Sequence, residues 1–264
     1  MRKRIPVVVQ RDVRGRRAVA RGLWTVAEAV VTLGVVLLLL VVHQLWWTNR
    51  QARADAEDEV RALRRTWREE APQGGGGTQR GGGARQGEGT AGAGSGAGTG
   101  SGEGPGSEGR AAPRRDQAYA VIRIPRIGLA APVAQGVGKH DVLDKGYVGH
   151  YPHTAQPGET GNFALAGHRN THGEPFRYLN RLRQGDLIGV ETRDAVYTYT
   201  VDRTLARTTA RDAGVIAAVP RSEVKPGAGY TAAGSYVTLT TCTPEFTSRY
   251  RLVVWGRLTG FRAR

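Results

Sequence analysis

The chain has 264 residues, one cysteine, 38 glycines and a formal net charge of +15 at pH 7. A single cysteine excludes an intramolecular disulfide and a cysteine-rich zinc module. Eighteen of the glycines lie within residues 74–109, and a segment that is half glycine cannot form a packed core. About 150 residues follow this tract, which is enough for one ordinary globular domain.

The positive charge is divided between distant parts of the chain. Residues 1–22 have a net charge of +7, residues 23–115 of +1 and residues 116–264 of +7. This distribution does not predict a single nucleic-acid-binding patch. Arg80 and Arg85 lie in the glycine-rich tract without aromatic residues between them on which bases could stack. We therefore expect no nucleic acid among the partners.

Residues 23–47 predict a transmembrane anchor that contacts membrane lipid. Their central part, residues 29–45, is almost wholly apolar, and a helix of roughly 20 residues spans the hydrocarbon core. Trp24 lies near one end and Trp46 and Trp47 at the other, where aromatic rings favour the membrane interface. A cleaved signal peptide is disfavoured because the apolar segment is long and no small-residue cleavage site follows it.

Flanking charge predicts the orientation of this anchor. Eight Lys and Arg residues in the basic segment 1–22 precede it, and the positive-inside rule predicts that this segment is cytoplasmic and that everything after Asn49 is extracellular. Residues 48–70 predict a charged, solvated helical stalk. Residues 71–115 predict a Gly-rich flexible linker with an r.m.s. span of roughly 35 Å. Such a linker would let the domain at 116–264 sweep a volume near the membrane.

Strand-length segments rich in Val, Ile, Thr and Tyr, separated by Gly and Pro, dominate the C-terminal domain. This pattern predicts a mainly β fold, either a barrel or a sandwich. The expected strands are residues 119–124, 162–166, 186–191, 195–201, 236–241 and 250–255, with short helices after Pro175 and at 211–219.

Cys242 is the first candidate for chemistry. A free cysteine is commonly a buried small hydrophobe, but this one lies at the end of an expected strand in a domain predicted to be exported. A cysteine nucleophile needs a partner that favours the thiolate. His168 is the best candidate, because it follows the apolar segment 162–166 where a strand gives way to a loop. His140 is interpreted as a surface histidine.

Arg251 is the candidate for binding substrate and the oxyanion formed during acyl transfer. It lies nine residues after Cys242, at the start of an expected strand. If the two strands pair, Arg251 returns beside Cys242 and offers a fixed fork of donors. Arg249 is a rival that faces the same side but lies deeper in the turn.

Residues 117–258 resemble the sortases, which are cysteine transpeptidases of Gram-positive cell surfaces. The matching segments are NFALAGHR around His168, TLTTCTP around Cys242, RLVV from Arg251, and HYPHTAQPGETGN between His150 and Asn162. The resemblance implies an eight-stranded sortase-type β-barrel with short helices. It also implies that His168, Cys242 and Arg251 are the catalytic histidine, nucleophile and arginine.

The resemblance implies a membrane-anchored enzyme that cleaves the C-terminal sorting signal of secreted proteins between Thr and Gly. A thioester acyl-enzyme would form, and an amine of the peptidoglycan precursor would receive the protein, with hydrolysis as a side reaction. The segment GHYPHTA resembles class E sortases of actinobacteria, which are associated with LAXTG signals. By this resemblance Tyr151 is the substrate-specificity residue and Thr241 lines the site. No cofactor and no metal are expected.

Three alternatives stay open at this point. His150, His153, His168 and His172 could supply four imidazoles to zinc. An L,D-transpeptidase would also use Cys and His, although its nucleophile follows Gly rather than Thr. A non-enzymatic, tethered cell-wall-binding module would use the basic outer domain to hold anionic polymers and would not need Cys242.

Overall fold

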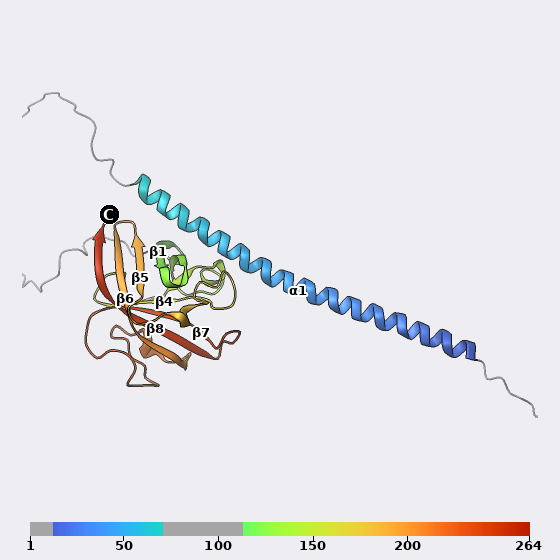
Figure 1. Cartoon of the computed structure of the whole chain (residues 1–264). Helices are drawn as coiled ribbons and strands as arrows, with labels where there is room; N and C mark the ends of the chain where they lie inside the picture. Colours follow the sequence, from blue (N-terminus) through green and yellow to red (C-terminus); the bar gives the residue numbers. More distant parts are fainter. Residues whose placement is uncertain (1–12, 71–112) are drawn as a thin grey trace, which may run out of the picture.

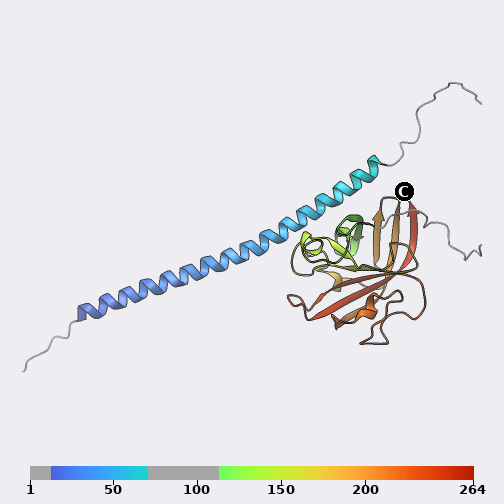
Figure 2. The same ribbon diagram turned by 180° about the vertical axis from the view of Figure 1, so that it is seen from behind.

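The computed structural model describes residues 13–70 and 113–264. A long helix and a β-domain lie side by side, with the domain next to the C-terminal part of the helix (Figure 1). Figure 2 shows the same arrangement from behind. The helix is α1 (Val13–Glu69), and the strands are β1 (Ala118–Ile124), β2 (Leu129–Gln135), β3 (Val148–His150), β4 (Gly161–Ala166), β5 (Leu187–Thr192), β6 (Ala195–Thr209), β7 (Ser235–Thr243) and β8 (Tyr250–Ala263).

The eight strands form a closed barrel in the order β1-β2-β3-β4-β7-β8-β6-β5. The pairs β2–β3 and β4–β7 are parallel, whereas the neighbours of β8 are both antiparallel to it. Closure satisfies the backbone hydrogen bonds of every strand on both sides and leaves no open sheet edge. The mainly β, eight-stranded barrel expected from the sequence is confirmed.

Two strands were not expected from the sequence. β2 contains Pro132 and three alanines, and β3 has only three residues, so neither shows the β-branched alternation of the other strands. β6 and β8 extend to Thr209 and Ala263, well beyond their expected ends. The expected helices are reduced to 3-10 turns at Leu179–Arg181 and Ala213–Ile216.

The barrel interior is one continuous apolar core. It contains side chains from all eight strands, including Ile122, Phe163, Tyr199, Leu239 and Val254, each at most 1% exposed. Their burial removes apolar surface from water at roughly 25 cal/mol per Å² and is the main stabilising contribution to the domain.

β8 buries both of its faces. Val254 points into the barrel, whereas its neighbours Val253 and Trp255 belong to a second apolar cluster with Tyr230 and Tyr236. The segment after β6 covers this outer cluster, and the indole of Trp255 donates a hydrogen bond to the carbonyl of Val215 at 3.1 Å. β8 therefore lies as a rigid central strand between two cores.

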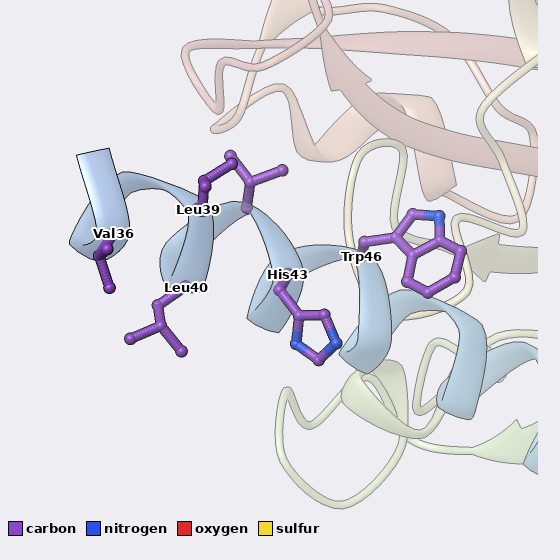
Figure 3. A pocket seen from close by; sticks show the side chains of 6 residues that line it. Val36, Leu39, Leu40, His43 and Trp46 are labelled. Carbon is purple, nitrogen blue, oxygen red and sulfur yellow. The ribbon is translucent and has the colours of Figure 1, made fainter. Parts of the chain in front are cut away.

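The N-terminal part of α1 is long and apolar enough to cross a membrane, with a mean hydropathy of 2.6 over its most apolar stretch. The side chains of residues 21–44 are exposed all round, and the guanidinium of Arg50 stacks 4.4 Å above the ring of Trp46. Figure 3 shows a shallow apolar hollow along this part, lined from one helix alone by Val36, Leu39, Leu40, Val42, His43 and Trp46. Lipid tails would cover such a surface.

The C-terminal part of α1 docks on the barrel, so the prediction of a solvated stalk is wrong. Ala52, Ala56, Val60 and Trp67 recur at helical spacing and are each less than a tenth exposed. Val60 and Trp67 pack against Val121 of β1. The alanines that favour a helix also form its contact face, which composition alone does not reveal.

Ion pairs and a close backbone approach complete this docked face. Arg64 makes a bidentate pair with the nearly buried Glu191, at 3.0 and 3.1 Å. A Cβ at Gly146 would lie 2.7 Å from the carbonyl oxygen of Ala52, so this position requires glycine. The domain is therefore held against its own helix. The predicted linker at 71–115 and the basic segment at 1–22 lie largely outside the described residues.

His150 is a fully buried polar residue inside the barrel. Its Nδ1 lies 2.8 Å from the Tyr119 hydroxyl and 2.9 Å from Gln135 Oε1, and its Nε2 lies 2.9 Å from Thr154 Oγ1. Either tautomer thus finds a donor and an acceptor. Burial lowers the pKa of His150 from 6.5 to about 4, because the charged imidazolium is disfavoured there.

We predict that His150 makes the barrel sensitive to mild acid. Between pH 6.5 and about 4, His150 is protonated in the unfolded chain but stays neutral in the folded barrel. The free energy of unfolding is therefore highest above pH 6.5 and decreases as the pH falls through this range. The full loss would be about 3 kcal/mol, at about 1.4 kcal/mol per pKa unit. Urea unfolding at pH 7 and pH 5 should show a steeper decline for the wild type than for His150→Gln. His153→Gln, at an exposed histidine, should decline like the wild type. Equal declines for wild type and His150→Gln would contradict the prediction.

Candidate active site

β7 and β8 bring Cys242 and Arg251 together. Cys242 is a free, half-buried cysteine near the end of β7. In the antiparallel pairing of β7 with β8, Cys242 lies directly opposite Arg251. Directly opposed residues of paired strands project from the same face of the sheet. The strand pairing expected from the sequence is therefore present.

β4 brings His168 to the same end of β7. Its last residue, Ala166, pairs with Thr240 in the parallel β4–β7 ladder. The backbone then stays in contact, because Gly167 N–H donates to the Thr240 carbonyl at 3.2 Å and Thr241 Oγ1 donates to the Gly167 carbonyl at 2.8 Å. His168 therefore follows β4 at the same end of β7 that bears Cys242.

His168 is held by a carboxylate. Its Nε2 lies 2.9 Å from Asp144 Oδ1, and both side chains are less than a fifth exposed. Burial lowers the pKa of His168, and the hydrogen bond to Asp144 offsets part of that effect. The neutral imidazole therefore predominates at neutral pH. Sequence analysis missed Asp144, which lies 24 residues before the histidine in a loop without a recognisable motif.

Arg251 points its guanidinium along its own loop. Its Nη1 donates to the carbonyls of Ser248 and Tyr250 at 2.9 and 3.0 Å. The rival Arg249 is exposed and stacks 5.3 Å from the Tyr250 ring centroid. The strand register thus favours Arg251 over Arg249 as the partner of Cys242.

Arg169 binds the backbone at Cys242, and this contact was not predicted from the sequence. It is 7% exposed, and its Nη1 donates to the Cys242 carbonyl at 3.3 Å and to Thr243 Oγ1 at 3.0 Å. A buried arginine that binds a backbone carbonyl fixes that peptide strongly, because the hydrogen bond is charge-assisted. The sequence feature that could have indicated Arg169 is its position directly after His168.

Tyr151 contacts β7 through Thr240. The Tyr151 hydroxyl lies 3.1 Å from Thr240 Oγ1, which itself donates to the Leu165 carbonyl. Tyr151 is therefore the donor in the first of these hydrogen bonds. Because side chains alternate along a strand, Thr240 lies on the same face of β7 as Cys242, whereas Thr241, which was expected to line the site, lies on the other face.

The four-histidine alternative for zinc does not assemble, because His150 is buried in the barrel with its own hydrogen-bond partners. His168 and His172 do lie close together, with ring centroids 5.4 Å apart, and Asp144 lies between their nitrogens.

Comparisons with known proteins agree with this geometry. The family model of the sortase domain matches residues 122–259. Two curated relatives from Streptomyces coelicolor are similar over nearly the whole chain. Sortase SrtE1 is 37% identical over 90% of this chain and 58% of its own length. Sortase SrtE2 is 30% identical over 93% of this chain and 87% of its own length.

Solved structures give the same result for the barrel. The crystal structure of sortase E1 from S. coelicolor, with a tripeptide in its active site, is 46% identical, covers 58% of this chain and 94% of its own, and has a TM-score of 0.54. Sortase E from Streptomyces avermitilis is 40% identical, covers 57% of this chain and 93% of its own, and has a TM-score of 0.51. The matched region, the barrel and the opposition of Cys242 and Arg251 agree: the chain belongs to the sortase family of cysteine transpeptidases, and its similarity is to class E.

Proposed function

We propose that this chain is a membrane-anchored sortase in which Cys242 is the nucleophile, His168 the general acid and base, and Arg251 the substrate- and oxyanion-binding residue. The observation that carries the proposal is the position of β7, which is paired with β8 opposite Arg251 and with β4 just before His168. A wall-binding module would not need these three side chains at one end of one strand.

The first half-reaction forms an acyl-enzyme. Neutral His168 accepts the proton of the Cys242 thiol as sulfur attacks the threonine carbonyl carbon of the sorting signal. The carbonyl oxygen becomes an oxyanion, which the N–H groups of Arg251 stabilise. When the Thr–Gly bond breaks, the imidazolium of His168 gives its proton to the leaving glycine amine. The products are a thioester on Cys242 and the released C-terminal peptide.

The second half-reaction transfers the protein. An acceptor amine attacks the thioester carbonyl, and His168 accepts the proton that this amine loses. A new amide bond forms, the carbon–sulfur bond breaks, and the proton returns to Cys242. The proposed acceptor is an amine of the peptidoglycan precursor, and attack by water instead gives hydrolysis as a side reaction.

Tyr151 is the proposed specificity residue, with an LAXTG-like sequence as the proposed signal. Its hydroxyl is turned toward Thr240, on the face of β7 that also bears Cys242. A tyrosine held there fills space next to the nucleophile and distinguishes the residue that precedes the variable position of the signal. The tripeptide in the active site of the similar S. coelicolor enzyme supports a peptide substrate.

The proposed location is the cell membrane, with the N-terminus in the cytoplasm and the barrel outside. The apolar part of α1 supplies the anchor, and the basic residues before it favour the cytoplasmic side. Secreted proteins that bear the sorting signal would then meet Cys242 at the outer membrane face.

We predict that the full-length chain in detergent ligates an LAXTG peptide to triglycine, with a smaller rate for an LPXTG peptide. Mass spectrometry would detect the ligated product and a thioester adduct on Cys242. The variant Cys242→Ala should give neither product, because no other cysteine exists in the chain. Binding of wall polymer without ligation, and equally by Cys242→Ala, would instead favour the non-enzymatic module.

Tyr151→Phe should reduce the preference for LAXTG over LPXTG. The substitution keeps the ring but removes the donor that holds it to Thr240, so the ring gains freedom next to the bound signal. We expect the ratio of kcat/KM values to fall by roughly tenfold, the effect of about 1.4 kcal/mol. Tyr178→Phe, at an exposed tyrosine, is the control and should keep the wild-type ratio. An unchanged ratio in Tyr151→Phe would exclude this role.

Arg169→Met should lower kcat by roughly 10- to 100-fold with a smaller change in KM, because the Cys242 peptide loses a charge-assisted hydrogen bond. Arg249→Met, at an exposed arginine of the neighbouring loop, should retain near wild-type kcat. Circular dichroism would check that the barrel still forms. A folded Arg169→Met variant with wild-type kcat would show that the contact does not position the nucleophile.

A further inference from the structure

Asp144, His168 and His172 form a compact cluster of metal-ligating side chains that includes the proposed catalytic histidine. One ligand atom from each side chain lies within 4.8 Å of the others. Asp144 Oδ1 is shared, at 2.9 Å from His168 Nε2 and 3.5 Å from His172 Nδ1. The proposed catalytic role of His168 does not require His172, nor does it require His172 Nδ1 to lie close to Asp144 Oδ1.

The spacing of these atoms matches a tetrahedral zinc site. Two ligand atoms bound to zinc at about 2.0–2.1 Å lie about 3.3 Å apart when the geometry is tetrahedral. The two observed separations from Asp144 Oδ1 fall on either side of that value. Two imidazoles and one carboxylate are also a common zinc set with a fourth position left for water. Calcium and magnesium prefer oxygen ligands and are not suited to this set.

The state of His172 is a second, independent observation. Its Nδ1 is buried and has no hydrogen-bond partner among the described residues, although it is directed toward Asp144. An unsatisfied buried nitrogen is costly in a folded protein unless a further partner completes it. A metal ion bound between His172 and Asp144 would use this lone pair.

The two segments that supply the ligands are held in place. Asp144 lies in the 3-10 turn Leu143–Lys145, and His140 Nδ1 lies 3.3 Å from the second carboxylate oxygen of Asp144. Beyond His172, Gly173 N–H donates to Asn49 Oδ1 of α1 at 2.7 Å. Little rearrangement is therefore needed for binding. The positive charge of Lys139 acts on His168 and disfavours binding of a cation there. The affinity for a metal ion must therefore come from its bonds to the three ligands.

We propose that Asp144, His168 and His172 bind one Zn²⁺ ion, and that zinc in this site switches the enzyme off reversibly. In the metal-free protein Nε2 of the neutral ring donates its proton to the Asp144 carboxylate, and the lone pair is on Nδ1. The metal would bind Nε2 in the other tautomer, so the ring proton would move from Nε2 to Nδ1. A neutral imidazole bound in this way can no longer accept the thiol proton of Cys242. The inhibitory part of this inference rests on the proposed function, whereas metal binding does not.

The experiment uses the full-length chain in detergent after chelator treatment and desalting. Titration with Co²⁺, a spectroscopic substitute for Zn²⁺, should produce the visible absorption bands of a four-coordinate site at one ion per chain. Zn²⁺ should then displace the Co²⁺. His172→Gln and Asp144→Asn should each weaken zinc binding by roughly 10- to 100-fold, the usual effect of disturbing a metal site. His153→Gln is the control and should bind like the wild type.

Cys242→Ala separates this site from metal capture by the thiol. The variant cannot ligate peptides, but it should bind Co²⁺ and Zn²⁺ like the wild type if the three proposed residues are the ligands. Loss of binding in Cys242→Ala, or unchanged binding in His172→Gln, would overturn the proposal. So would the absence of the cobalt bands at millimolar metal concentration.

Inhibition is then measured as the ligation rate at each zinc concentration relative to the zinc-free rate of the same variant. The wild type should lose at least about tenfold in rate at saturating zinc, and chelator should restore it. His172→Gln should need roughly tenfold more zinc for the same loss. Zinc binding without any inhibition would overturn the switch while leaving the metal site intact. If the wild type binds zinc but ligates no peptide, the proposed function has failed and the site has not.

Discussion

The active site depends on the backbone hydrogen bonds that β7 makes on its two sides. The parallel ladder with β4 continues past the end of that strand through Gly167, so the loop that bears His168 cannot move away from Cys242 without breaking it. The antiparallel ladder with β8 fixes Arg251 on the other side. Both neighbours are themselves buried, and β8 lies between two apolar cores. The packed core of the barrel therefore holds in place the backbone that bears Cys242, His168 and Arg251 at one end of β7.

The long helix α1 also contacts this end of the barrel. Its apolar part, which is long enough to cross a membrane, continues without interruption into the docked face that begins at Asn49 and Arg53. Arg53 binds the Gly173 carbonyl and the buried Glu174, a few residues beyond His168. If α1 is the proposed membrane anchor, a domain held in this way would have a fixed distance and orientation relative to the membrane surface. This would be a stronger constraint than a glycine tether imposes, and it would favour substrates that present a signal close to the membrane.

The sequence predicted the elements with strong local patterns and missed those that depend on tertiary contacts. The mainly β class, six of the strands and the opposition of Cys242 and Arg251 follow from alternation and spacing, whereas the choice of a barrel came from the resemblance to sortases. β2 and β3 lack such patterns and form because neighbouring strands pair with them. Asp144, Arg169 and Thr240 were missed because their roles arise from distances between loops and from the face on which a side chain lies. The docked stalk was misjudged because half of its contact stripe, Ala52 and Ala56, consists of alanine, which also favours a solvated helix.

His168 has two possible partners with opposite chemical consequences. As a base it needs a free lone pair and a pKa that lets it accept and release a proton, and burial next to Asp144 provides a neutral but polarised ring. A zinc ion would instead require Nε2, the ring nitrogen that faces the same carboxylate, with His172 added. In the proposed scheme Asp144 serves both states, because the carboxylate that orients the imidazole also supplies, together with that imidazole, two of the three metal ligands. The proposed enzyme would therefore lose activity as the concentration of free zinc rises.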